Sequence, residues 1–138
     1  MILESAVYAL LLLILMVFSM NLTTALQLMI SPADIGYSFG AGVYEELLFR
    51  ALLLQGLLMA VRYFPGKDLW WKAGAVLVSA LAFSGAHYIG AGGDVFHALS
   101  FFSRTMGGIM LGSIYMLRGL GAAVYTHAIY DVYTVLII

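Results

Sequence analysis

Five long apolar stretches constrain the fold of this chain more than any other feature. An apolar helix of about 20 residues crosses the hydrocarbon core of a bilayer. The stretches cover residues 6–30, 35–63, 69–88, 95–117 and 121–138. The chain is also only 9% charged, whereas a soluble domain carries about 25% charged residues. We therefore predict an all-α, polytopic membrane helix bundle of about five transmembrane helices, built as a single domain over residues 1–138.

Short polar or glycine-rich segments separate the predicted helices. In the segment Ser-Pro-Ala-Asp at residues 31–34, Asp34 is placed to cap the second helix. The third helix opens on Trp70 and Trp71, which are typical of a membrane interface. The first stretch lacks the basic segment and the small-residue cleavage site of a signal peptide, so we expect it to be retained.

The charges of the turns predict an orientation, because Lys and Arg concentrate on the cytoplasmic side. Two turns that would share one face carry Arg62, Lys67, Lys72 and Arg118. The opposite turns hold Asp34 and Asp94 and no Lys or Arg. We therefore predict an integral protein of a bacterial or archaeal cytoplasmic membrane, with its N-terminus inside and its C-terminus outside.

Charge and cysteine content exclude several classes of function. A net charge of −1 gives no reason to expect a nucleic-acid partner. The absence of cysteine excludes disulfides, thiolate metal sites and a cysteine nucleophile.

Three ionisable side chains lie within the second apolar stretch: Glu45, Glu46 and Arg50. A charge at the centre of a bilayer costs roughly 2.5 to 3.5 kcal/mol in insertion measurements, so such residues usually mark a functional site. Glu46 and Arg50 are four residues apart and can pair on one helix face. Glu45 is turned by about 100° from Glu46, so it is free to face another partner. The alternative is that Glu46 and Arg50 form a purely structural buried pair.

Other polar residues lie at comparable depth in other predicted helices. His127 and Asp131 are four residues apart in the last helix, and His87 follows Phe83 by four residues in the third. At a rise of 1.5 Å per residue, all of them fall in the middle or outer part of their helices. We therefore expect these groups and the acidic pair to meet in one cavity. The alternative for the histidines is interhelical hydrogen bonding without catalysis.

Two features of the fourth helix also predict contacts. The pattern Gly-x-x-x-Gly at Gly108 and Gly112 allows another helix backbone to approach closely. Arg104 has three candidate roles, namely to line the cavity, to bind a substrate carboxylate, or to pair with Asp94.

The motifs Glu-Glu-x-x-x-Arg, Phe-x-x-x-His and His-x-x-x-Asp, in this order, resemble the CPBP family of intramembrane proteases. That family includes the CAAX prenyl endopeptidases and bacteriocin-processing or immunity proteins. The resemblance covers residues 43–133 and leaves the first helix unmatched. Two positions depart from the common pattern: Ala51 stands where Gly is frequent, and Asp131 stands where Asn is frequent.

The resemblance implies hydrolysis of a peptide bond within the membrane. Glu45 would act as the general base on a water that His87 orients, and Glu46 with Arg50 would hold the helix face in place. His127 and Asp131 would face the scissile carbonyl and stabilise the oxyanion. Asp131 can donate a hydrogen bond only when protonated, so its alternative role is to orient His127.

Several alternatives stay open. A catalytic zinc bound by His87, His127 and Glu45 is the alternative to a metal-free, cofactor-free reaction, although the chain has no His-Glu-x-x-His motif. The fold could also serve as a non-catalytic scaffold or immunity protein, or as an ion or proton carrier. Expected partners are membrane lipids, a peptide or protein substrate cleaved near the membrane, and a second copy or another membrane protein. The substrate could be a prenylated C-terminus, a leader peptide or a sorting tail.

Overall fold

The computed structural model describes residues 2–19, 32–63, 69–90 and 92–137. These residues form α1 (Ile2–Ser19), α2 (Pro32–Glu46), the π-helix η2 (Leu47–Leu54), α3 (Gln55–Val61), α4 (Leu69–Ala86), α5 (Ala98–Arg118) and α6 (Leu120–Ile137). No strand occurs in these four segments. Because α2, η2 and α3 follow one another without a break, they form a single helical rod. The predicted all-α fold is therefore confirmed.

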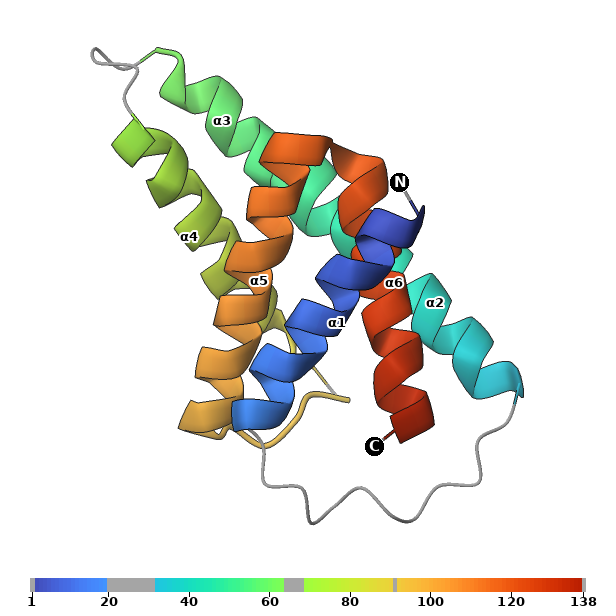
Figure 1. Cartoon of the computed structure of the whole chain (residues 1–138). Coiled ribbons are helices and arrows are strands. Elements are labelled where there is room, and N and C mark those ends of the chain that lie inside the picture. Colours follow the sequence, from blue (N-terminus) through green and yellow to red (C-terminus); the bar gives the residue numbers. More distant parts are fainter. Residues whose placement is uncertain (1, 20–31, 64–68, 91, 138) are drawn as a thin grey trace.

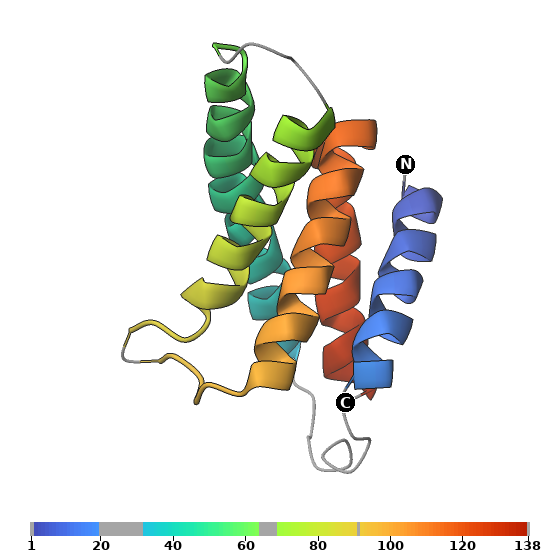
Figure 2. The ribbon, with the colours of Figure 1, turned by 90° about the vertical axis from the view of Figure 1, so that its left-hand side faces the viewer.

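The helices run alternately up and down (Figure 1). The N-terminus, the end of α3, the start of α4 and the end of α5 lie at one end of the bundle, and the C-terminus lies at the other. α6 packs against both α1 and α2, and α5 packs against α4. Figure 2 shows α1 and the α2–α3 rod on opposite flanks, with α5 and α6 between them. The end of α3, the start of α4 and the end of α5 thus bring Arg62, Lys72 and Arg118 to one end of the molecule, as their turns predict, while Lys67 lies outside the described residues.

By length and composition, one helix of the described segments is apolar enough to cross a membrane, namely Leu69–Ala86, while the apolar part of α1, Ile2–Met16, is shorter. The other predicted spans form helices as well. Residues 20–30 of the first predicted span lie outside the described residues.

Several predicted boundaries differ from the structure, and the first helix already begins at Ile2 rather than at residue 6. The second helix begins at Pro32, so Asp34 lies inside it and does not precede it as a cap. Proline is favoured in a first helical turn because its missing N–H has no intrahelical partner there. The fourth helix begins at Ala98, not at Val95, because the backbone is still extended at His97 (φ −127°, ψ 125°).

The π-helix is a feature that the sequence pattern does not predict. It begins directly after Glu46 and includes Arg50. Segments of π-helix are rare and occur frequently at functional sites. The hydroxyl of Ser79, on α4, donates a hydrogen bond to the carbonyl of Phe49 within this segment at 2.8 Å. This contact fixes α4 against the part of the rod that carries Arg50.

Close approach of α4 and α5 depends on the predicted glycine pair. A Cβ atom at Gly108 would lie 3.0 Å from both Cα and Cβ of Ala80, and one at Gly112 would lie 3.1 Å from Val76 Cγ1. α4 is therefore the helix whose backbone approaches α5 closely at the Gly-x-x-x-Gly pattern.

Gly108→Ala is expected to destabilise the protein by about 1 to 3 kcal/mol, because the added methyl group forces α4 and α5 apart. The measurement is the free energy of unfolding in an SDS titration of mixed micelles. Gly74→Ala on α4 is the matched control, since nothing lies within 4 Å of its added Cβ. Equal behaviour of the two variants would contradict the close contact.

Candidate active site

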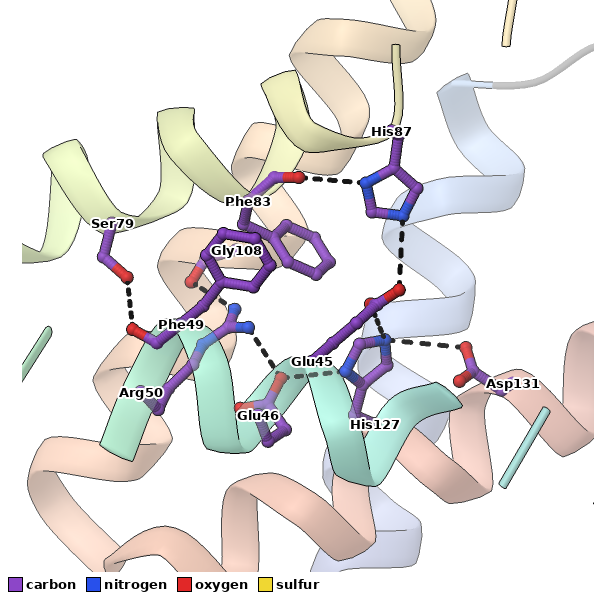
Figure 3. A network of polar contacts seen from close by, with 10 residues as sticks. All are labelled: Glu45, Glu46, Phe49, Arg50, Ser79, Phe83, His87, Gly108, His127 and Asp131. Atoms are coloured by element: carbon purple, nitrogen blue, oxygen red, sulfur yellow. Dashed lines mark hydrogen bonds and ion pairs between the residues drawn. The ribbon is translucent and has the colours of Figure 1, made fainter. Parts of the chain in front are cut away.

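A buried ionic network joins α2, η2, α5 and α6 (Figure 3). Glu46 and Arg50 are both 0% exposed. Arg50 Nη1 donates to Glu46 Oε1 at 2.7 Å, which confirms the predicted pair, and Arg50 Nη2 donates to the carbonyl of Gly108 at 3.2 Å. The same Glu46 oxygen lies 2.8 Å from His127 Nδ1. Glu46 is therefore the link between a cation on its own rod and an imidazole on α6.

This network assigns the protons of the His127 ring. Arg50 has only donors to offer, so the Glu46 oxygen accepts from it as a carboxylate. His127 Nδ1 must then donate its proton to the same oxygen. The other ring nitrogen, Nε2, lies 3.6 Å from Glu45 Oε2 and 3.6 Å from Asp131 Oδ1. His127 thus presents Nε2 to two further carboxyl groups.

His87 lies in the turn directly after α4 and is oriented in a comparable way by the last turn of that helix. Its Nδ1 lies 2.9 Å from the carbonyl of Phe83, and a carbonyl oxygen can only accept, so Nδ1 is the donor. In the neutral ring Nε2 is then an acceptor. That atom lies 3.9 Å from Glu45 Oε1. Glu45 therefore has one carboxylate oxygen directed toward each imidazole.

Phe83 holds the aromatic groups of the site in place. Its ring makes edge contacts with Phe49, His87 and His127, with centroids 5.4, 5.0 and 5.7 Å apart. The Arg50 guanidinium also lies 4.6 Å from the centre of the Phe83 ring. Phe83 thus packs against His87, as their interval of four residues favours, and the ring has the additional role of a cation–π partner.

Four of the six predicted site residues line one cavity of about 410 Å³: Glu45, His87, His127 and Asp131. Figure 3 shows their side chains directed toward one another, with Glu46 and Arg50 to the left of them. The side chain of Glu45 is 26% exposed, so water can reach it. The six residues therefore form two layers, one that lines the cavity and a buried one that supports it, and within the first layer His127 is itself only 5% exposed.

The cavity also has walls that the motifs do not reveal. Leu12 and Met16 of α1 line it, as do Ser100, Ser103, Tyr130 and Thr134. The first helix, which no motif covers, is therefore part of the site. Apart from Tyr130, an aromatic hydroxyl within an apolar stretch, no sequence signal marks these residues, because ordinary apolar and hydroxyl side chains acquire this position only through the packing of α1 against α5 and α6.

Arg104 combines two of its three predicted roles. It lines the cavity, and its Nη2 pairs with Asp94 Oδ2 at 2.6 Å. Its guanidinium also lies 5.3 Å from the centre of the Tyr88 ring. These contacts attach the start of α5 to the loop that follows α4.

The side chains are not arranged as a zinc site of His87, His127 and Glu45 would require. Among the residues that the structure describes, no three His, Asp or Glu side chains are placed to hold a metal ion together. The two Nδ1 atoms are engaged with Phe83 and Glu46. Only the Nε2 atoms of His87 and His127 face Glu45.

Comparison with known proteins assigns the family. No curated protein and no solved structure matches the chain significantly. The family described as type II CAAX prenyl endopeptidase Rce1-like matches residues 4–133. This match includes α1, which the motifs alone leave out. The chain therefore belongs to the type II CAAX prenyl endopeptidase Rce1-like family, a family of membrane-embedded proteases.

Proposed function

We propose that the protein is an intramembrane endopeptidase that hydrolyses a peptide bond in a membrane-embedded or membrane-adjacent substrate. The observation that carries this proposal is the position of Glu45. It is the one member of the acidic pair that lines the cavity, and its two oxygens face the Nε2 atoms of His87 and His127. A base beside two imidazoles in a sheltered cavity is suited to activating water for attack on a carbonyl.

The distance between Glu45 and His87 suits a shared water molecule. Their facing atoms are 3.9 Å apart, too far for a direct hydrogen bond, yet one water can lie about 2.8 Å from both. Both atoms are acceptors, so that water donates one proton toward each and turns a lone pair toward the substrate. Glu45 takes the proton as the oxygen attacks the carbonyl carbon, and it then gives that proton to the leaving amine.

His127 is the candidate stabiliser of the oxyanion. Its Nδ1–H is held by Glu46, so a second proton on Nε2 makes the ring a cationic donor. The surrounding carboxyl groups of Glu45, Glu46 and Asp131 favour that cation electrostatically. A preorganised donor of this kind contributes about 3 kcal/mol to transition-state stability. Arg50 in turn holds Glu46 in place, so Glu46 and Arg50 together position His127.

The proposed orientation follows from the charges at the two ends. The end that carries Arg62, Lys72 and Arg118 would face the cytoplasm. The cavity is lined by the early part of α5 and the late part of α6, so it lies toward the opposite end of the bundle. This arrangement favours an exported substrate over a cytosolic prenylated one.

The test is a cleavage assay with the purified protein in vesicles that contain membrane-anchored reporter peptides. Mass spectrometry of the products is expected to show one new N-terminus in each cleaved peptide, and Glu45→Gln is expected to abolish it. Cleavage that persists undiminished in Glu45→Gln would overturn the proposed base. A biological function that is unchanged by this substitution would favour the scaffold or immunity role instead.

Asp131→Asn is expected to keep measurable cleavage, because Asp131 acts on the substrate through His127 and Asn preserves its shape. The loss in kcat should be smaller than the roughly 100-fold cost of removing a direct oxyanion donor. Steady-state kinetics in the same vesicles measure it. Complete loss of activity with normal insertion would show that the carboxylate itself is required.

Exhaustive chelation is expected to leave cleavage unchanged, because Glu45 rather than a metal ion activates the water in this reaction. The measurement compares initial rates before and after dialysis against a chelator, with metal analysis of the same samples. Activity that is lost and restored only by zinc would assign His87, His127 and Glu45 as ligands instead.

A further inference from the structure

A second cavity lies at the end of the bundle opposite to the candidate active site. Its volume is about 700 Å³, and it is formed by residues of α3, α4, α5 and α6 with Arg62, which follows α3. Two cations, Arg62 and Lys72, line it together with apolar side chains such as Leu58 and Met116. In its wall the hydroxyl of Tyr115 donates to Gln55 Oε1 at 2.8 Å, so these polar groups satisfy each other. The two cations are left to face the cavity.

The charge of this cavity is not neutralised within the described residues. Neither Arg62 nor Lys72 forms an ion pair with another described residue, and no described acidic residue lines the cavity. By contrast, Arg118 at the same end pairs with Glu4 at 2.6 Å. Two cations that have no ion pair among the described residues, in a cavity with largely apolar walls, favour an anionic occupant.

The surrounding aromatic residues place these cations at the level of lipid headgroups. Tyr63 is 91% exposed beside Arg62, and Trp70 is 82% exposed two residues before Lys72. Exposed Trp and Tyr side chains mark the interface between the hydrocarbon core and the headgroups. The anion that meets Arg62 and Lys72 is therefore at the depth of a phospholipid phosphate.

An apolar groove continues from this cavity along α4 and α5. It has a volume of about 320 Å³ and shares Lys72 and Met116 with the larger cavity. The rest of its lining is apolar except for Ser113, whose hydroxyl donates to the carbonyl of Ile109 at 2.8 Å. A phosphate ion gains nothing from apolar contacts in such a groove, whereas an acyl chain would fill it.

We propose that this end of the protein binds an anionic glycerophospholipid, with its phosphate between Arg62 and Lys72 and one acyl chain in the groove between α4 and α5. Basic pockets between membrane helices are suited to anionic headgroups. The site is separate from the Glu45 cavity, so it does not depend on the proposed protease activity. It would anchor the α3–α4 end of the bundle to a specific lipid.

The test uses the fluorescence of Trp70 and Trp71, the only two tryptophans of the chain. Both lie at the start of α4, next to the proposed site. The protein is reconstituted in phosphatidylcholine vesicles that contain a small fraction of brominated phosphatidylglycerol or, for comparison, brominated phosphatidylcholine. Bromine quenches tryptophan on contact, so the ratio of quenching gives the relative association of the two lipids.

Phosphatidylglycerol is expected to associate at least about fivefold more strongly than phosphatidylcholine, the effect of one basic residue near an anionic surface. The double variant Arg62→Gln/Lys72→Gln is expected to lose this preference. The control Arg118→Gln removes a cation from the same end and should keep it. Ala73→Phe, which fills the groove without changing charge, should weaken quenching by both brominated lipids.

Three results would overturn the proposal. Equal quenching by the two brominated lipids would show that no anionic lipid is selected. If Arg118→Gln lost the preference for phosphatidylglycerol as fully as Arg62→Gln/Lys72→Gln does, the preference would be due to the general surface charge of this end. Displacement of brominated phosphatidylglycerol by millimolar inorganic phosphate would assign the cavity to a free anion. Circular dichroism of each variant verifies that the helices are intact.

Discussion

Replacing Glu45 with Gln is expected to lower kcat for peptide cleavage by a factor of at least about 100, and by up to about 10⁴. This range is the usual contribution of a general base. Gln keeps the size of the side chain but cannot take a proton from water. The fold should survive, because Glu45 is partly exposed and belongs to neither the Glu46–Arg50 pair nor the Glu46–His127 contact. The measurement is single-turnover cleavage of a reporter peptide in vesicles.

Two controls make the result specific. Tyr44→Phe changes the preceding residue, which is 66% exposed and lies outside the cavity lining, and it should leave kcat within a factor of about two because surface changes are usually close to neutral. The thermal stability of Glu45→Gln should match that of the unmodified protein. If Glu45→Gln unfolds at a lower temperature, the loss of activity is due to a loss of structure. If Glu45→Gln is stable and still active, Glu45 is not the general base.

Arg50→Met is expected to destabilise the protein by about 3 to 5 kcal/mol, the cost of leaving one member of a buried ion pair without its partner. Glu46 would stay fully buried, with His127 as its remaining partner among the described residues. The carbonyl of Gly108 would also lose its hydrogen bond from Arg50. The free energy of unfolding in an SDS titration of mixed micelles measures the effect.

The double variant Glu46→Gln/Arg50→Met is expected to recover much of that loss. Gln is neutral, so it no longer needs the cation, and its amide oxygen can still accept from His127 Nδ1. The control Arg62→Met removes an exposed Arg just after α3 and should change stability by less than about 0.5 kcal/mol in zwitterionic micelles. If Arg50→Met were no more harmful than Arg62→Met, the pair would not hold the fold.

The helices and the local pairs could be predicted because they depend on residues close together in the sequence. Apolar stretches of about 20 residues predict long helices, and an interval of four residues places Glu46 beside Arg50 and Phe83 beside His87. The structure confirms both contacts. The start of the second helix was mispredicted because the Ser-Pro-Ala-Asp segment offers two competing signals, a cap at Asp34 and a first-turn proline at Pro32.

The contacts between helices could not be predicted in the same way. His127 Nδ1 and Glu46 Oε1 come from residues 81 positions apart, and no periodicity specifies which nitrogen of the ring meets which acid. The π-helix at Leu47–Leu54 has no sequence signal either. The entry of Leu12 into the cavity wall depends on the angle at which α1 packs against the bundle.

The sequence by itself therefore determined an all-helical chain with a small set of charged and imidazole groups at similar depth in apolar helices. The reason is that hydrophobic length, charge cost and helical spacing are local properties. The resemblance already implied that Glu45 acts on water while Glu46 pairs with Arg50. Only the tertiary structure decided that Glu45 faces both imidazoles and that Glu46 lies buried between Arg50 and His127. That division depends on how α2, η2 and α6 cross, because packing between helices fixes which face of each helix is enclosed and which one water can reach.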